Sequence, residues 1–486
     1  MSPSFFFYDL ETSGLNPKDA RIMQFAGLFT DLDLKTFSDP FNLLLKLTTD
    51  TLPEPQAILT TGIIPQKSLT EGISDVDFLN IFNREILNPG IIFAGYNSIR
   101  FDDEFMRYLL YRNFYDPYEW QWKDGRSRWD LLDVFRLIRA LRPEGVNWPF
   151  SVDGKPTNRL ELLTKQNGIN HIDAHDALSD VSALIAMTRL VRDRQPEMFD
   201  VLLNLRKKSE VEKLIKLNEA IIYTSGSFSS EFLHTTAVLP LVMTKSGVVV
   251  YDLRADPRPF LAMTGPELLV AMTFVKEDNR LRLPIKELRF NRCPALWPDR
   301  QILENADVQD RIKLTPKLVS DNRQKILNTQ PFITNLAEAW AIKTSSFFHQ
   351  TSLIDNPMAV DGLLYDGFIS EQDKSKCVSI HHLPAERLSQ LTGQFEDPRL
   401  NTLLPLFKAR NFPESLTKSE REAWSGFCAS KLLSGKNRSK LNLYFREIER
   451  LQSLKTLSTD RQKIVSDLKR YGDFVRDTVK TKKSNG

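Results

Sequence analysis

The chain has 486 residues, which is too long for one ordinary domain and suggests about three. With 41% hydrophobic and 26% charged residues, its composition is that of a globular protein with sizeable cores. A formal net charge of +3 does not by itself indicate a nucleic-acid binder, so any site for a polyanion must concentrate positive charge locally.

The N-terminus and the cysteines give expectations about location. The N-terminus lacks a basic region followed by a long apolar stretch, and no apolar run approaches the roughly 18 residues of a membrane span. Cys293, Cys377 and Cys428 are far apart and predict neither a disulfide framework nor a zinc site. We therefore expect a cytoplasmic protein that does not associate with membranes.

The first region, residues 1–195, alternates strand and helix patterns. Short apolar runs predict strands in "SFFFYDLE", "IMQFAGLFTDLD", "NLLLKLT" and "GIIFAGYN". Apolar residues at helical spacing predict helices in "DVDFLNIFNREIL", "DLLDVFRLIRALR" and "HDALSDVSALIAMTRLVRDRQ", the last of which ends before Pro196. This order favours an α/β region with a mixed sheet.

The pattern changes in the rest of the chain. "TAVLPLVMTKSGVVVYDL" contains two apolar runs around a Lys-Ser-Gly turn, which predicts a β-hairpin in a middle region of about 200–350. Helical patterns return in "REAWSGFCASKLL", "KLNLYFREIERLQSL" and "STDRQKIVSDLKRYGDFVRDTV". We expect an α/β region, a β-containing region with some helices, and a helical region, in that order.

Two carboxylates end the aromatic-rich first strand. Side chains two residues apart lie on the same face of a strand, so Asp9 and Glu11 project together while Leu10 points away. Their mutual repulsion is relieved when a cation lies between them, and oxygen ligands select Mg²⁺ or Mn²⁺. The triplet alone is a weak signal, because short motifs of this kind match easily by chance.

Three further polar residues lie at the starts of helices. Asp102 opens a helix after "GIIFAGYNSIRF", His175 stands at or just before a helix, and Asp180 lies in the early turns of that helix. Each has an ordinary structural explanation: a carboxylate at a helix start commonly caps it, a lone histidine is usually structural, and Asp180 could simply be exposed.

The order of these groups is more specific than any one of them. The succession D-x-E, N-x-x-x-F-D and H-x-x-x-x-D resembles the DEDD exonuclease superfamily, and a histidine five positions before the last aspartate resembles its histidine sub-type. The segments "GYNSIRFDDEF", "SRWDLLDV", "NRLELLTKQNGI", "HDALSDV" and "FKARNFP" are similar to the bacterial exonuclease I family. One departure is Leu10, where many relatives carry an aromatic residue.

The resemblance implies a fold and an activity. The fold would be a ribonuclease-H-like exonuclease domain with a mixed sheet (1–195), an SH3-like middle domain (196–352) and an α-helical C-terminal domain (353–486). The activity would be processive 3′-to-5′ hydrolysis of single-stranded DNA to 5′-mononucleotides, in DNA repair and recombination. Docking of the C-terminal tail of single-strand-binding protein is also implied, and we expect the chain to be a monomer.

The resemblance also implies roles for individual residues. Two Mg²⁺ ions, or Mn²⁺ in their place, would lie about 3.5–4 Å apart between the carboxylates. His175 would be the general base, because its ordinary pKa suits proton abstraction near neutral pH. The metal ligands would be Asp9, Glu11, Asp102 and Asp180, and the substrate contacts Glu11, Arg107, Tyr118, Trp122, Arg136 and Arg159.

A stretch of mixed cations and aromatic residues fits the expected substrate. Within "RYLLYRNFYDPYEWQWKDGRSR", bases would stack on the aromatic rings while cations follow the phosphates. The alternatives are that several of these rings belong to the core, and that Arg159 is an ordinary surface cation preceding a helix. Lys408 and Arg410 of "FKARNFP" are expected to add basic lining to the DNA groove.

Two alternative functions remain open. Another DEDD enzyme, such as an oligoribonuclease or a proofreading exonuclease, would need only a compact nuclease domain, whereas this chain adds two further regions. A catalytically silent binding protein would use the groove as a scaffold, although all five chemical positions are present. Release of nucleotides that depends on Mg²⁺ separates the enzyme from the silent protein.

Overall fold

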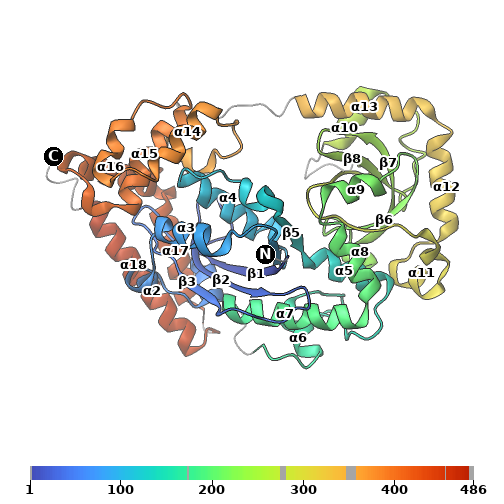
Figure 1. The fold of residues 1–486 in the computed structure, drawn as a ribbon, viewed down its shortest axis with the longest axis horizontal. Coiled ribbons are helices and arrows are strands. Elements are labelled where there is room, and N and C mark those ends of the chain that lie inside the picture. Colours follow the sequence, from blue (N-terminus) through green and yellow to red (C-terminus); the bar gives the residue numbers. More distant parts are fainter. Residues whose placement is uncertain (1–2, 172–174, 274–280, 346–356, 455, 481–486) are drawn as a thin grey trace.

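The computed structural model describes residues 3–171, 175–273, 281–345, 357–454 and 456–480. These residues form three regions, with the N-terminal region in the centre, the middle region on one side of it and the C-terminal helices on the other (Figure 1). The expected order of an α/β, a β-containing and a helical region is confirmed. Within the described ranges, no helix combines the length and the apolar composition that crossing a membrane requires.

The N-terminal region is built on a five-stranded sheet of order β3-β2-β1-β4-β5. β1 is antiparallel to β2 and parallel to β4, so the sheet is mixed, as expected. The fifth strand lies in "SRWD", which the apolar pattern did not mark as a strand. The strands are β1 (Phe5–Thr12), β2 (Ile22–Thr30), β3 (Phe41–Leu44), β4 (Ile92–Gly95) and β5 (Ser127–Asp130).

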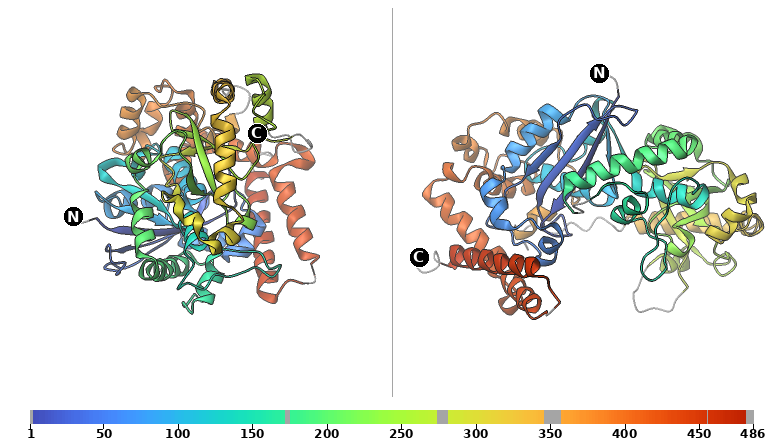
Figure 2. Two further views of the ribbon diagram at one scale, coloured as in Figure 1. Left: turned by 90° about the vertical axis from the view of Figure 1, so that its right-hand side faces the viewer. Right: turned by 90° about the horizontal axis from the view of Figure 1, so that it is seen from below.

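Helices cover both faces of this sheet, and α7 lies across one of them (green in Figure 2). A π-helical segment, η1 (Phe82–Ile86), continues α3 directly, so the expected helix over "DVDFLNIFNREIL" changes its hydrogen-bond pattern part-way. The helices are α1 (Pro55–Thr61), α2 (Pro65–Glu71), α3 (Asp75–Ile81), α4 (Asp102–Arg112), α5 (Leu131–Leu141), α6 (Leu160–Gln166) and α7 (Ala177–Arg194).

The alternation of side chains along β1 decides where its acids lie. Phe7 packs in the core formed with α5 and α7, whereas Tyr8 and Leu10 pack in a second core formed with α3 and α4. Because alternate residues of a strand point to opposite faces, Asp9 and Glu11 lie on the α7 side of the sheet. Leu10 is buried on the other side, which confirms that it points away from the acids.

The middle region contains an antiparallel sheet of order β10-β6-β7-β8-β9, and the expected hairpin is formed by β7 and β8. Its strands are β6 (Ile221–Thr224), β7 (Thr235–Met243), β8 (Gly247–Asp252), β9 (Ile285–Arg289) and β10 (Ala295–Trp297). Its helices are α8 (Pro196–Asn204), α9 (Lys208–Leu214), α10 (Gly265–Met272), α11 (Ala306–Ile312), α12 (Pro316–Leu327) and α13 (Gln330–Ser345).

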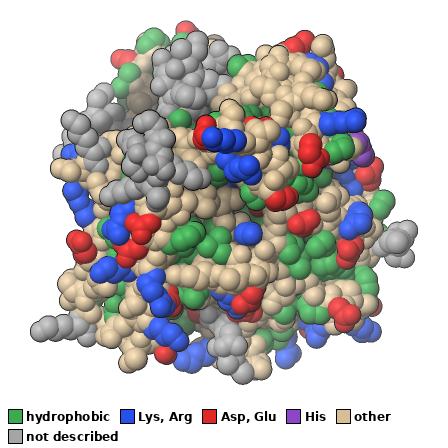
Figure 3. All heavy atoms as spheres, turned by 90° about the vertical axis from the view of Figure 1, so that its left-hand side faces the viewer, with side chains coloured by type: hydrophobic (Ala, Val, Ile, Leu, Met, Phe, Trp, Pro, Cys, Tyr) green, Lys and Arg blue, Asp and Glu red, His purple; other side chains and the backbone are tan. Residues whose placement is uncertain are grey.

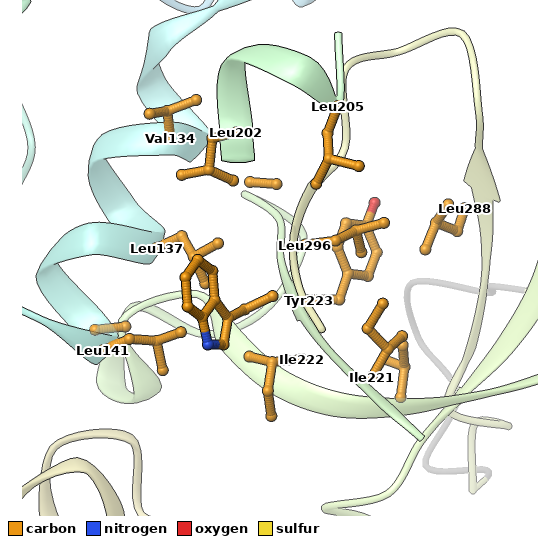
Figure 4. Packing of buried hydrophobic residues seen from close by; sticks show 14 of the residues in the cluster. Val134, Leu137, Leu141, Leu202, Leu205, Ile221, Ile222, Tyr223, Leu288 and Leu296 are labelled. Atoms are coloured by element: carbon orange, nitrogen blue, oxygen red, sulfur yellow. The ribbon is translucent and has the colours of Figure 1, made fainter. Parts of the chain in front are cut away.

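The N-terminal and middle regions share one hydrophobic core. Leu137 and Leu141 of α5 lie in the same cluster as Leu202 of α8 and Ile222 of β6 (Figure 4). Burying apolar side chains from both regions in one cluster removes their surface from water together. The core therefore fixes the position of the middle sheet relative to α5.

The C-terminal region is helical and packs on the opposite side of the N-terminal region. Its helices α17 and α18 contact α1, and α18 also contacts α2. On the face in Figure 3, Lys and Arg side chains are interspersed with Asp and Glu. The helices are α14 (Glu371–Ile380), α15 (Pro398–Asn411), α16 (Lys418–Leu433), α17 (Lys440–Gln452) and α18 (Thr459–Lys480).

The prediction that Lys408 and Arg410 line a DNA groove is wrong. The side chain of Lys408 is 4% exposed, and its Nζ lies 2.8 Å from Glu420 Oε1. Arg410 is equally buried and pairs with Asp50 of the N-terminal region and with Asp361. The motif that predicted basic lining therefore supplies one ion pair within the C-terminal region, at Lys408, and one that joins this region to the N-terminal region, at Arg410.

Candidate active site

The first two acids lie at the end of the central strand of the N-terminal sheet. Glu11 pairs in register with Gln24 of β2, and Glu11 is only 8% exposed. The Gln24 amide group donates to Asp176 Oδ1 at 3.0 Å, and its oxygen accepts the backbone N–H of Ala177. Since Asp176 is the N-cap of α7, Gln24 fixes the start of α7 beside Glu11.

Asp102 is brought to the same place by a tight turn after β4. Asn97 has φ of 65°, in the left-handed region, and its N–H donates to Asp130 Oδ1 at 2.9 Å. The N–H of Ile99 donates to the other oxygen of Asp130. The turn leads into α4, and Asp102 is the first residue of that helix, as expected, and is buried.

His175 and Asp180 complete the cluster from the start of α7. Glu11, His175 and Asp180 each offer a ligand atom, and these atoms all lie within 4.8 Å of one another. His175 precedes the N-cap and has φ of 71°, in a left-handed conformation that is unusual for a residue with a Cβ. Its side chain is exposed, so it can reach solvent while facing the acids.

Burial raises the pKa values of all four acids, and the charges of neighbouring acids add to it at Asp9, Glu11 and Asp102. Burial, followed by the charges of Asp102 and Asp180, holds the pKa of Asp9 well above its usual range. Burial together with the charges of Asp9 and Asp180 raises the pKa of Glu11 to about 9. Burial is also the main cause of the raised pKa values of Asp102 and Asp180. The structure therefore brings Asp9, Glu11, Asp102 and Asp180 into one electrostatic cluster.

This donor set fits divalent cations. Clustered carboxylates with raised pKa values are stabilised when positive charge is placed between them. Carboxylate oxygens suit Mg²⁺ and Mn²⁺, and one imidazole in the group is also compatible with a transition metal. A perturbed cluster of this kind, formed by residues distant in the sequence, is typical of a catalytic centre.

The structure adds a residue that the sequence analysis missed. His171 Nε2 lies 2.5 Å from Asp180 Oδ1, and His171 Nδ1 lies 3.0 Å from the hydroxyl of Thr164. The His171 side chain is 3% exposed. No spacing rule pointed to it, because it lies in the connection between α6 and α7, where helical periodicity does not apply.

Two expected substrate contacts are accessible. Trp122 is 62% exposed, so its ring is available for stacking. Arg159 is exposed and is the N-cap residue of α6. Tyr118 is half-buried, and the guanidinium of Arg107 lies 5.5 Å from its ring centre.

The two other expected contacts are already engaged. Arg107 is 8% exposed and pairs with Glu104 at 2.6 Å. Arg136 pairs with Asp133 at 2.7 Å, close to the junction with the middle region. Both guanidinium groups are therefore paired with carboxylates in this structure.

Family models match all three regions of the chain. An exonuclease model matches residues 6–188, the exonuclease I SH3-like domain matches 206–341, and the exonuclease I C-terminal domain matches 358–475. Exodeoxyribonuclease I of Haemophilus influenzae is 37% identical over 438 residues, covering 88% of this chain and 90% of that protein. The chain belongs to the exonuclease I family. It is therefore a nuclease, a hydrolase of phosphodiester bonds.

Another exonuclease I relative is similar to this chain in sequence, and solved exonuclease I structures are similar to it in fold, over most of its length. Exodeoxyribonuclease I of Escherichia coli is 37% identical, covering 87% of this chain and 88% of that protein. A crystal structure of E. coli exonuclease I with a dA16 oligonucleotide has a TM-score of 0.90 and 34% identity, covering 98% of this chain and all of that one.

Two more of these exonuclease I structures bear on ligands. A zinc-bound form of the E. coli enzyme with single-stranded DNA has a TM-score of 0.90 and 33% identity. An ExoI/SSB-Ct complex has a TM-score of 0.88 and 33% identity. Each covers 98% of this chain and the whole of the solved chain. The SH3-like and helical regions are thus those of the exonuclease I fold, as the sequence resemblance implied.

Proposed function

We propose that the chain removes nucleotides from the 3′ end of single-stranded DNA, and that it does so processively, with two divalent cations, in DNA repair and recombination. The observation that carries this is the convergence of Glu11, His175 and Asp180 with two further acids, Asp9 and Asp102, in a member of the exonuclease I family. The products would be 5′-mononucleotides.

The acids and the imidazole would divide the chemistry. Asp9, Glu11, Asp102 and Asp180 would hold two Mg²⁺ ions, with Mn²⁺ able to substitute, and bound cations of this kind activate water and stabilise a leaving oxygen. His175 would accept the proton of the attacking water, and its exposure supports transfer of that proton to solvent. Burial of Glu11 would keep bulk water from weakening these interactions.

The DNA strand would be held by side chains beside this centre. Trp122 and Tyr118 would stack on bases, Arg107 and Arg136 would contact phosphates, and Arg159 would contact the phosphate that is cut. Glu11 would also face the terminal nucleotide. Domain limits of 1–195, 196–352 and 353–486 are part of this proposal.

The partner protein, the metal and the compartment are also part of this proposal. An ExoI/SSB-Ct complex supports docking of the C-terminal tail of single-strand-binding protein on this chain. A zinc-bound relative supports metal binding by this chain without favouring Mg²⁺. We assign Mg²⁺ because four of the five groups are carboxylates, which suit hard cations. The three cysteines are unpaired and buried, which supports a reducing compartment such as the cytoplasm.

The deciding experiment uses single-stranded DNA labelled at either end. With Mg²⁺, label at the 3′ end should be released first as a mononucleotide, and EDTA should stop the release. Asp180→Asn should abolish the Mg²⁺-dependent activity while circular dichroism shows an intact fold. Release of the 5′ label first would contradict the polarity, and activity in EDTA would contradict the metal requirement.

The same assay separates the alternatives. Duplex DNA and short RNA should be degraded much more slowly than single-stranded DNA, whereas an oligoribonuclease would prefer the RNA. A silent binding protein would retain DNA without releasing any nucleotide. Processivity is tested by adding excess unlabelled trap DNA after binding, when a distributive enzyme would release one nucleotide per encounter.

A further inference from the structure

His171 is buried between two helices and has both ring nitrogens engaged. Its Nε2 lies 2.5 Å from Asp180 Oδ1 on α7, and its Nδ1 lies 3.0 Å from Thr164 Oγ1 on α6. The side chain is 3% exposed, whereas His175 is exposed to solvent. The two histidines near Asp180 are therefore in different environments.

The hydrogen-bond chain has a defined direction. An ionised Asp180 can only accept, so Nε2 of His171 carries the hydrogen and donates it. In a neutral ring Nδ1 is then an acceptor, and the Thr164 hydroxyl can donate to it. Each member of the chain Thr164, His171 and Asp180 thus has a matched partner.

The segment that carries His171 is fixed to α6. Thr164 is fully buried, and the N–H of Ile169 donates to its carbonyl oxygen at 2.9 Å. His171 follows two residues later, so its ring is held at both the backbone and the side chain. The position of Asp180 Oδ1 is therefore set by α6 as well as by α7.

We propose that His171 is a positioning residue that orients the Asp180 carboxylate for metal binding; this inference rests on the proposed role of Asp180 as a ligand. Asp180 lies among acids that repel it, since the charge of Asp180 is felt at both Asp9 and Glu11. A hydrogen bond on one oxygen opposes rotation of the carboxylate away from the cluster. The second oxygen remains available to a cation.

Residues that hydrogen-bond a metal ligand affect metal affinity even though they do not touch the metal. Replacing a residue that hydrogen-bonds a ligand typically costs about 10- to 100-fold in metal affinity or activity. The described hydrogen bonds of the His171 side chain are to Asp180 and Thr164, so it acts on the cluster through Asp180. Its removal should therefore weaken cation binding even when no DNA is present.

The test measures Mn²⁺ binding directly, by calorimetry or by the electron paramagnetic resonance of free Mn²⁺, without DNA. His171→Leu should weaken Mn²⁺ affinity about 10- to 100-fold. His171→Gln should stay close to wild type, because its amide N–H₂ can donate to Asp180 in place of Nε2. Thr164→Val should weaken affinity less, and should add nothing to His171→Leu in the double variant.

The matched control is His381→Leu. His381 of the C-terminal region is partly buried, and its Nε2 lies 3.3 Å from the carbonyl oxygen of Phe114 in the N-terminal region. This variant should bind Mn²⁺ as wild type does, even if its melting temperature falls. A purely structural role for His171 would likewise lower the melting temperature without changing Mn²⁺ affinity.

The outcomes separate this inference from the proposed function. A folded His171→Leu that binds Mn²⁺ with wild-type affinity, while Asp180→Asn does not bind it, overturns the positioning role alone. Unchanged binding in Asp180→Asn overturns the metal assignment and this inference with it. Should His171→Leu fail to fold, wild-type affinity in Thr164→Val overturns the positioning role.

Discussion

Arg410 of α15 and Asp50, which precedes α1, form a buried ion pair of 2.7 Å between the C-terminal and N-terminal regions. Asp50 is fully buried, and Lys431 of α16 approaches the same oxygen at 2.7 Å. Although burial opposes it, the charges of Arg410 and Lys431 hold the pKa of Asp50 well below its usual range. These buried charges therefore join the two regions, because separating the regions would leave each charge without its partner.

Replacing Arg410 should therefore destabilise the whole chain. Arg410→Met leaves Asp50 and Asp361 with fewer buried partners, and such changes cost about 3–5 kcal/mol in the free energy of unfolding. The control is Lys374→Met, which removes an exposed pair with Glu371 and should cost about 1 kcal/mol or less. Urea denaturation followed by circular dichroism measures both. Equal costs would contradict the role of this pair.

Loss of the general base should affect turnover more than binding. His175→Ala should lower the rate of nucleotide release by about 10²- to 10⁴-fold, because proton transfer from water then lacks a positioned acceptor. Affinity for single-stranded DNA, measured by fluorescence anisotropy with Ca²⁺ in place of Mg²⁺, should change little. A rate within a few-fold of wild type would show that another group accepts the proton.

The acidic cluster should make the metal-free chain sensitive to pH. Burial and the charges of Asp9 and Asp180 raise the pKa of Glu11 from 4.5 to about 9 in the folded chain. The folded state then binds more protons than the unfolded state between these values, so stability in EDTA should fall as pH rises through this window. Divalent cations favour the ionised acids, so the stabilisation by Mg²⁺ should grow as pH rises.

Thermal unfolding between pH 6 and 9, with Mg²⁺ or EDTA, checks this expectation. The difference in melting temperature between the two conditions should widen with pH. Glu11→Gln is the control. It removes the carboxyl with the raised pKa, so the difference in melting temperature between Mg²⁺ and EDTA should be smaller than in the wild type. A larger effect of Mg²⁺ at pH 6 than at pH 9 would contradict the cluster as its binding site.

Trp122 and Trp120 provide a matched pair for the DNA path. Trp122 is 62% exposed, so Trp122→Ala should weaken binding of single-stranded DNA by about 1–3 kcal/mol while stability stays nearly unchanged. Trp120 is 2% exposed and packs on Phe93, so Trp120→Ala should instead cost about 3–5 kcal/mol of stability. Fluorescence anisotropy measures the DNA affinity of both variants, and urea denaturation measures their stability. Unchanged affinity in Trp122→Ala would show that Trp122 does not contact the DNA.

Local features of the site were predictable from the sequence, and its long-range features were not. The alternation along β1 placed Asp9 and Glu11 on one face, and Asp102 begins its helix as expected. Their convergence depends on sheet order, which a single sequence does not encode locally; the family resemblance supplied it. Arg410 was misassigned because its partner Asp50 lies 360 residues earlier in the chain.

The left-handed backbone conformation at His175 makes glycine a suitable replacement at this position. A φ of 71° is readily adopted by glycine and costs other residues energy, so His175→Gly should relieve local strain while removing the ring. Because the position is exposed, the space left behind is open to small molecules. Free imidazole added to the buffer should restore part of the lost activity, which would report on the missing group itself.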